Sequence, residues 1–225
     1  GVGGIRMVEA DFLKELQAVC EAHNTVLICD EIQCGYGRSG KFFAFEYADI
    51  VPDVILASKA IGGSQPLSVV IYNKKLDKWE QGAHAGTFRG NQLAMAAGTV
   101  VMNRVSKPEF LEEVREKGKI IEERLLALKA KTKIIGDVRA KGLMIGTEFV
   151  NPKGQPDGIG SLPTSGEIAA KVQKICFENG FVAEKGGRGG SVMRCLCALN
   201  ITKDEINTAM DIFEKVVLQV AKEYE

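Results

Sequence analysis

Two short apolar runs constrain the fold of this chain more than any other feature of the sequence. Residues Thr25 to Cys29 and residues Asp53 to Ala57 are rich in β-branched and aliphatic side chains, and both runs are too short for a helix. The first run ends in Asp30-Glu31, the second ends in Ser58-Lys59, and glycines follow both. Such runs are typical of strands buried on both faces, so the sequence predicts an α/β sheet, much of it parallel.

Helical patterns lie between and after these strands. Residues 9–23 carry apolar side chains at helical spacing, and residues 68–72 form a third strand-like run. We expect a buried helix over residues 91–105 and a long amphipathic helix over residues 109–131, which Pro108 opens.

The second half of the sequence has α+β character. It predicts strands over residues 134–140 and 143–150, one or two further strands over residues 181–184 and 192–196, and helices over residues 167–179 and 203–225. We place the domain boundary near residue 103, so that residues 1–103 are part of a larger sheet domain and residues 104–225 are a small domain. A sheet of about three strands leaves exposed edges. We therefore expect that a preceding segment is missing from this chain or is supplied by another chain.

Charge and cysteine usage exclude several classes of function. Lys and Arg number 29, as do Asp and Glu, so no electrostatic argument favours nucleic acid or an anionic membrane as a partner. No apolar run is long enough to span a membrane. The six cysteines show no metal-ligand spacing and lie within apolar runs, which predicts reduced thiols, no metal site and a cytoplasmic protein.

Asp30 and Lys59 are the two residues whose positions suggest chemistry. In open α/β sheets ligands bind beyond the carboxyl ends of the strands, where both residues are expected to lie. A lysine desolvated at such a site becomes nucleophilic, as Schiff-base chemistry requires. Read locally, however, Asp30 is as well explained as a cap of the next element, and Lys59 as a lysine whose stem reaches the surface.

Three motifs together resemble the class-III pyridoxal-phosphate aminotransferases. They are Asp30-Glu31-Ile32-Gln33-Cys34-Gly35-Tyr36-Gly37-Arg38-Ser39-Gly40, then Ser58-Lys59-Ala60-Ile61-Gly62-Gly63, then Thr87-Phe88-Arg89-Gly90-Asn91-Gln92-Leu93-Ala94. Their order and spacing agree with that family, and the resemblance covers the whole chain. It implies part of a large fold-type I sheet domain followed by an α+β small domain, with pyridoxal 5′-phosphate as the cofactor.

The resemblance also implies roles for individual residues. Lys59 would bind the cofactor covalently and move the proton of the reaction, and Asp30 would pair with the pyridine nitrogen. Gln33 would lie near the ring hydroxyl. Thr87 would bind the phosphate of the neighbouring subunit, which makes the chain part of a homodimer with a shared active site.

Arg194 is the residue that matches the family's substrate-binding arginine. It would hold a substrate carboxylate through a two-pronged, charge-assisted contact. The sequence departs from the family at Cys197-Ala198, where two prolines are usual, so we expect a less rigid loop beside Arg194. A surface ion pair is the competing reading of this arginine.

Within the family, the residues from Gly82 to Ala94 and from Gln65 to Ser68 most resemble those of the diaminobutyrate:2-oxoglutarate transaminases. Small amino acids and 2-oxo acids would then be the substrates, once the missing N-terminal half is supplied. Transaminases of acetylornithine, ornithine or 4-aminobutyrate are alternatives, and so are a related aminomutase, decarboxylase or racemase. A structural fragment without cofactor or activity also remains open.

Overall fold

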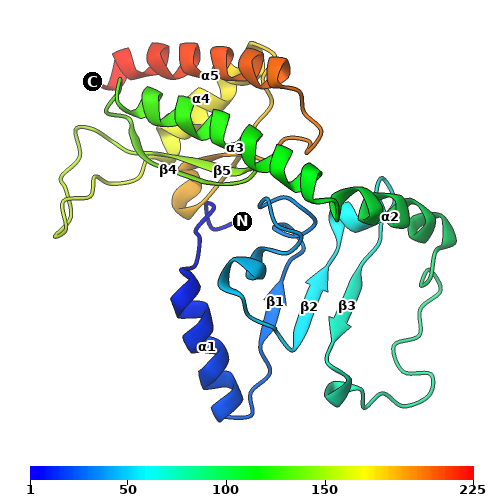
Figure 1. Cartoon of the computed structure of the whole chain (residues 1–225). Coiled ribbons are helices and arrows are strands. Elements are labelled where there is room, and N and C mark those ends of the chain that lie inside the picture. Colours follow the sequence, from blue (N-terminus) through cyan, green and yellow to red (C-terminus); the bar gives the residue numbers. More distant parts are fainter. The chain divides into compact units, whose positions relative to one another are not determined.

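A computed structural model describes all residues from 1 to 225 (Figure 1). The chain divides into two compact units, each of which is described by itself. One comprises Met7–Glu112, and the other comprises Gly1–Arg6 together with Glu113–Glu225. No helix is both long and apolar enough to cross a lipid bilayer.

The unit Met7–Glu112 contains a three-stranded sheet in the order β1-β2-β3. Its strands are β1 (Ile28–Asp30), β2 (Val54–Ala57) and β3 (Val69–Tyr72). The β1–β2 pair is parallel and the β2–β3 pair is antiparallel. All three predicted strands are thus confirmed, and the prediction of a parallel arrangement holds for one of the two pairs.

Two helices accompany this sheet at the predicted places, α1 (Ala10–Ala22) and α2 (Gln92–Val105). Leu13 and Leu16 of α1 pack on a small core that includes Leu27 and Ile50. The α2 helix begins where the Asn91 side chain accepts hydrogen bonds from the amides of Leu93 and Ala94, which are unpaired donors at a helix start.

The prediction that the strands and the helix α2 are buried is wrong for this unit. Ile28 of β1 is 55 % exposed and Val70 of β3 is 50 % exposed. In α2 the apolar side chains of Leu93 and Val100 are exposed, and α1 has no buried residue. The physical reason is that no other element of the unit covers these faces. The exposed apolar surface of this unit therefore comprises several side chains rather than one isolated residue.

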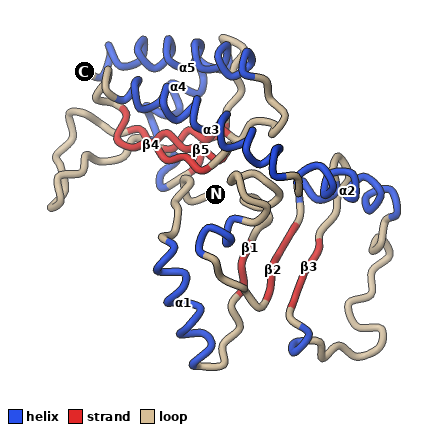
Figure 2. The backbone as a smooth tube through the Cα atoms, in the orientation of Figure 1, coloured by secondary structure: helices blue, strands red, loops and turns tan.

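The second unit is an antiparallel sheet with helices on one face (Figure 2). The strand order is β4-β5-β7-β6, with β4 (Ile135–Lys141), β5 (Met144–Phe149), β6 (Glu184–Gly186) and β7 (Val192–Cys195). The helices are α3 (Pro108–Lys129), which starts in the first unit's residues, α4 (Gly166–Glu178) and α5 (Lys203–Tyr224). The α5 helix starts at a capping box of Thr202 and Glu205, which satisfies two free amides.

One strand in this unit begins later than predicted. Residues 181–184 were expected to form it, whereas β6 runs from Glu184 to Gly186. Its register on β7 pairs Glu184 with Arg194, while the Phe181 ring packs edge-on against Phe213 of α5. Packing in the core, rather than strand pairing, therefore determines the position of Phe181.

The opposite face of this sheet is covered by the chain's own first residues, Gly1–Arg6. Ile5 is 2 % exposed and lies over Gly146, where a Cβ would come 3.0 Å from an Ile5 carbon. Every residue of β5 is buried, which fits a strand that is covered on both faces. No local sequence pattern links these six residues to the second half of the chain.

Candidate functional site

Lys59 lies directly after the carboxyl end of β2, in a strained turn. Its φ angle is +53°, a conformation that residues other than glycine seldom adopt. The hydroxyl of the preceding Ser58 holds the turn, since it donates to the Leu67 carbonyl at 3.0 Å and lies 2.9 Å from the Ser68 hydroxyl oxygen. Non-glycine residues in such conformations cluster at functional sites, so the strain favours a role for Lys59 beyond that of a surface lysine.

A close helix contact supports this turn from behind. Gly98 of α2 approaches the Ile61 carbonyl so closely that a Cβ at Gly98 would lie 2.4 Å from the oxygen. Gly62 is similarly tight, with a Cβ position 2.9 Å from the Leu67 side chain. The two glycines therefore let α2 and the following loop pack against the turn that carries Lys59.

Asp30 lies at the same edge of the sheet as Lys59. It is the last residue of β1, and it pairs with Leu56 in the parallel ladder, three residues before Lys59. Parallel strands present their carboxyl ends at one edge, which is the usual ligand side of an α/β sheet. Asp30 is exposed, and its Oδ1 accepts a hydrogen bond from the Ile32 amide at 3.0 Å. It thus makes a local capping bond and remains accessible at the sheet edge.

Gln33 lies in the loop after β1, and its side-chain oxygen is buried without a hydrogen-bond partner. An unpaired buried acceptor is costly, and such groups often mark the place of a ligand or an ordered water. This loop also contains Tyr36, which is 1 % exposed and has a φ angle of +53°.

Glu31 organises this loop, a role that sequence reasoning did not recognise. Its carboxylate is 2 % exposed and accepts the amides of Ala44 and Phe45, both at 3.0 Å. It also accepts the Cys34 thiol at 3.2 Å. Burial, with a further contribution from the charge of Glu31, raises the pKa of Cys34 to about 12. The acidic pair in the sequence was the only available signal, and it did not show which of the two residues turns inward.

Thr87 lies in the exposed loop between β3 and α2. The side chains of this loop do not pack into the core of the unit, and Phe88, the neighbour of Thr87, is 90 % exposed. The position of Thr87 is compatible with a contact to another subunit, but that role stays a prediction.

Arg194 belongs to the other unit, where it occupies the centre of β7. Its side chain is only 7 % exposed. Nη2 donates to Glu184 Oε2 at 2.8 Å, whereas Nε and Nη1 are buried and have no hydrogen-bond partner. Two unpartnered donors on a buried guanidinium are costly and favour a role in binding an acceptor, which stays a prediction here. The competing reading of a surface ion pair accounts only for the contact with Glu184.

The structure therefore places Asp30 and Lys59 at one edge of the first unit's sheet, with Gln33 in the loop that follows β1 and Thr87 in the same unit. Arg194 is placed in the second unit. The six cysteines are free thiols, of which Cys176 is buried and the other five are half-buried.

Residues 1–217 match the class-III aminotransferase family. The chain belongs to this family. It is 40 % identical over 222 residues to the diaminobutyrate–2-oxoglutarate aminotransferase of Haemophilus influenzae, a match that covers 99 % of this chain and 49 % of that protein. The corresponding enzyme of Rhizobium meliloti is 45 % identical, and the match covers 92 % of this chain and 44 % of that enzyme. The chain thus spans about half the length of these curated relatives.

Solved structures of this aminotransferase family share the fold. The N-acetylornithine aminotransferase of Stenotrophomonas maltophilia superposes with a TM-score of 0.83 at 25 % identity, over 99 % of this chain and 55 % of that one. The acetylornithine aminotransferase of Elizabethkingia anophelis gives a TM-score of 0.82 at 29 % identity, over 97 % and 52 % of the two chains. The chain therefore has the fold of the matching part of these aminotransferases, as the sequence predicted.

Proposed function

We propose that this chain forms part of a pyridoxal-phosphate-dependent transaminase that acts on the terminal amine of L-2,4-diaminobutyrate, with 2-oxoglutarate as the amine acceptor. The observation that carries the proposal is the placement of Lys59 and Asp30 at the carboxyl edge of two adjacent parallel strands. A nucleophilic amine and a carboxylate at one ligand-binding edge are what this chemistry needs.

The residues at this edge fit the cofactor. Gln33 has an unpartnered buried oxygen, which a hydroxyl group on the cofactor ring would satisfy. Lys59 would hold the cofactor covalently, Asp30 would hold a proton on its pyridine nitrogen, and Thr87 of a second subunit would bind its phosphate. When bound, pyridoxal 5′-phosphate supplies an electron sink that stabilises negative charge on the substrate carbon.

Lys59 and Asp30 have separate tasks in the proposed reaction. The Lys59 amine takes the proton from the substrate carbon that bears the amino group, and later returns a proton. The Asp30 carboxylate keeps the proton on the ring nitrogen throughout, which maintains the electron-withdrawing strength of the ring. The strained backbone at Lys59 limits the directions that its side chain takes.

Arg194 selects substrates that carry a carboxylate. Its Nε and Nη1 are desolvated and have no hydrogen-bond partner, so a carboxylate that reaches either donor gains a charge-assisted hydrogen bond. Both L-2,4-diaminobutyrate and 2-oxoglutarate have such a group. The Cys197-Ala198 departure from the family pattern leaves Arg194 on a regular strand, β7, with its side chain buried.

Several similar relatives support diaminobutyrate as the amine donor, because they bear the name of that transaminase at 38–45 % identity. Acetylornithine aminotransferase of Caldanaerobacter subterraneus, at 34 % identity, supports the alternative of another ω-amino acid. Asp30 and Lys59 are compatible with both donors, since they act on the cofactor and on the reacting carbon rather than on the rest of the substrate.

Complete activity is proposed only for the chain joined to a preceding half. The exposed apolar faces of β1, β3, α1 and α2 are the surfaces that such a half would cover. We further propose a homodimer, in which the exposed Thr87 loop of one subunit reaches the cofactor of the other.

A chimera tests this proposal, in which the chain replaces the matching half of the Haemophilus influenzae enzyme. We expect a cofactor absorbance band, glutamate formation from diaminobutyrate and 2-oxoglutarate, and a pyridoxyl label on Lys59 after borohydride reduction. A label on Lys74 or Lys75 would refute the assignment of Lys59. A folded chimera with no band would favour the alternative of an inactive structural fragment, and a preference for acetylornithine would change the donor.

A further inference from the structure

Arg139 and Arg194 stand in one cross-strand row of the second unit's sheet. In the antiparallel ladders Arg139 pairs with Gly146, Gly146 pairs with Arg194, and Arg194 pairs with Glu184. Residues directly opposite one another in such ladders point to the same face. Both guanidinium groups therefore belong to the face that Gly1–Arg6 covers, and the absence of a side chain at Gly146 leaves room between them.

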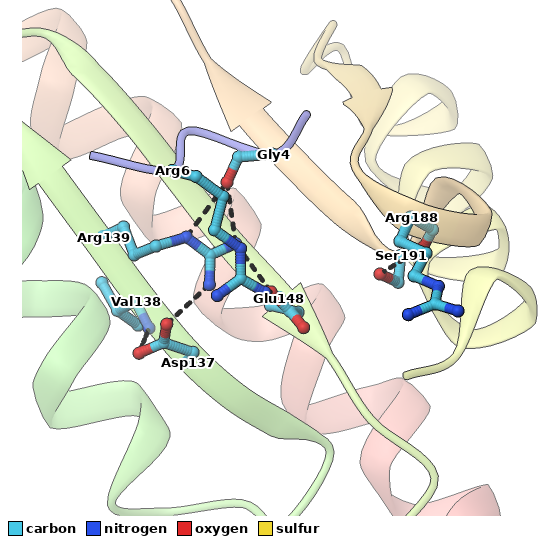
Figure 3. Close-up of polar contacts among 8 residues, drawn as sticks. All are labelled: Gly4, Arg6, Asp137, Val138, Arg139, Glu148, Arg188 and Ser191. Atoms are coloured by element: carbon cyan, nitrogen blue, oxygen red, sulfur yellow. Dashed lines mark hydrogen bonds and ion pairs between the residues drawn. The ribbon is translucent and has the colours of Figure 1, made fainter. Parts of the chain in front are cut away.

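The segment Gly1–Arg6, here called the strap, is fastened to this face by Arg139 (Figure 3). Arg139 donates from Nε at 3.0 Å and from Nη2 at 2.7 Å to the carbonyl oxygen of Gly4. A second backbone contact joins the strap to the turn after β6, since the Gly187 amide donates to the Val2 carbonyl at 3.0 Å.

Glu148 completes the fastening. Its Oε2 lies 2.7 Å from Arg139 Nη2 and 3.0 Å from Arg6 Nη2, and the side chains of Arg139 and Glu148 are both about 10 % exposed. Asp137 lies 2.6 Å from Arg139 Nη1, so two carboxylates balance two guanidinium groups. A buried charge is costly unless it is paired, which makes this network depend on all its members.

The strap itself is strained. Ile5 has a φ angle of +57° although it is β-branched, and it is 2 % exposed. Such a conformation persists only where the surrounding contacts enforce it. Here those contacts are the Gly4 carbonyl held by Arg139 and the close packing of Ile5 over Gly146.

The strap and the Arg194 guanidinium both lie close to Gly186. A Cβ at Gly186 would lie 2.7 Å from Arg194 Nε and 3.1 Å from the Val2 carbonyl oxygen. Glycine at this position therefore lets both groups approach the same point. The strap is thus the part of the chain next to the free Nε donor of Arg194.

We propose that Arg139 and Glu148 are positioning residues for the Arg194 carboxylate clamp. They hold the strap on the sheet, and the strap confines the guanidinium and keeps water from its free donors. Neither residue touches the substrate. This inference rests on the proposed function in so far as Arg194 binds a carboxylate, but the confinement of Arg194 is a property of the chain without substrate.

Nuclear magnetic resonance of the arginine Nε–Hε groups in the full chain tests this directly. The Arg194 signal is identified by its loss in Arg194→Lys. Two quantities are then measured for this signal. They are the rate at which Hε exchanges with water, and the change in chemical shift on titration with glutarate, a dicarboxylate that cannot react. The variants are Arg139→Lys and Glu148→Gln. The matched control is Arg188→Gln, which removes an exposed arginine that lines a cavity on this face together with Gly3, Arg6 and Glu148, and whose side chain lies apart from Gly4 and Arg6 in Figure 3.

We expect Arg139→Lys to speed the exchange of Arg194 Hε about tenfold or more, because local opening exposes it, while helix amides exchange as before. Glutarate binding should weaken at least about threefold as the clamp loses its fixed geometry, with a smaller change in Glu148→Gln. Arg188→Gln should change neither quantity. Unchanged exchange in a folded Arg139→Lys variant would overturn the proposal.

The two inferences fail in different ways. If the unaltered chain shows no shift of Arg194 with glutarate, the clamp of the proposed function is wrong, whereas the exchange measurement still decides the role of the strap. If Arg139→Lys does not fold, Glu148→Gln decides in its place, since it keeps the shape of the side chain and removes the charge that Arg139 and Arg6 share. Faster exchange of Arg194 Hε in this variant supports the proposal, and unchanged exchange contradicts it.

Discussion

Glu184 faces Arg194 across the β6–β7 ladder and accepts a hydrogen bond from its Nη2 at 2.8 Å. This contact leaves a negative charge beside the two donors that are free for a substrate carboxylate. Glu184→Gln keeps an oxygen acceptor for Nη2 and removes the charge. Glutarate should then bind more tightly, by about threefold, because the Glu184 side chain is 67 % exposed and water screens its repulsion.

Titration of glutarate at low and high salt measures this effect. The gain in affinity should shrink as salt rises. Glu178→Gln removes an exposed carboxylate from the end of α4 in the same unit and serves as the control. Weaker binding by Glu184→Gln would show that the charge of Glu184 is needed to hold Arg194 in place.

Asp30→Asn is expected to reduce turnover far more than cofactor binding. The amide cannot hold a proton on the ring nitrogen, so the stabilisation of negative charge in the transition state falls, by an amount on the order of 3 kcal/mol. The Asn side chain still accepts the Ile32 amide, so the local turn should persist. Steady-state rates and cofactor affinity of the chimera measure the two effects. Near-normal turnover would reduce Asp30 to a capping residue.

Gly98→Ala tests the contact behind Lys59. Replacing a helical glycine by alanine normally stabilises a helix by about 1 kcal/mol. Here the new methyl group would lie 2.4 Å from the Ile61 carbonyl oxygen, so the clash should prevail and lower the free energy of unfolding by about 1–3 kcal/mol. Urea unfolding measures the change, and Ala96→Val at an exposed position of α2 should stay within about 0.5 kcal/mol. A more stable Gly98→Ala variant would show that α2 moves freely against the turn.

Alkaline pH should destabilise the loop around Glu31. The pKa of Cys34 is raised from 9.0 to about 12, first by burial and then by Glu31. Between these two values the unfolded chain loses the thiol proton and the folded chain keeps it, so stability falls as pH rises, by about 1.4 kcal/mol per pH unit for this group. Urea unfolding at several pH values above 9 should show a shallower loss for Cys34→Ala. An identical pH dependence in the two proteins would contradict the shift.

The sequence alone determined the family, the helices and most of the strands, because these depend on local patterns. Strand runs that end in Asp30 and in Lys59 specify an α/β edge, and the order of three motifs identifies the chemistry. Helical spacing correctly located α1, α3, α4 and α5 within a few residues.

Only the tertiary structure decided which residues support these sites. Arg139 and Gly4 are 135 positions apart, and Arg6 and Glu148 are 142 apart, so no local pattern links them. The burial of a strand could not be predicted from the sequence either, since an apolar strand has the same pattern whether or not another element covers it. Ile28, in such a strand, is 55 % exposed. Likewise, the acidic pair at residues 30–31 became two different groups, because backbone amides from residues 44 and 45 reach Glu31 and leave Asp30 at the sheet edge. Long-range contacts fix such roles because their partners meet only after the chain has folded.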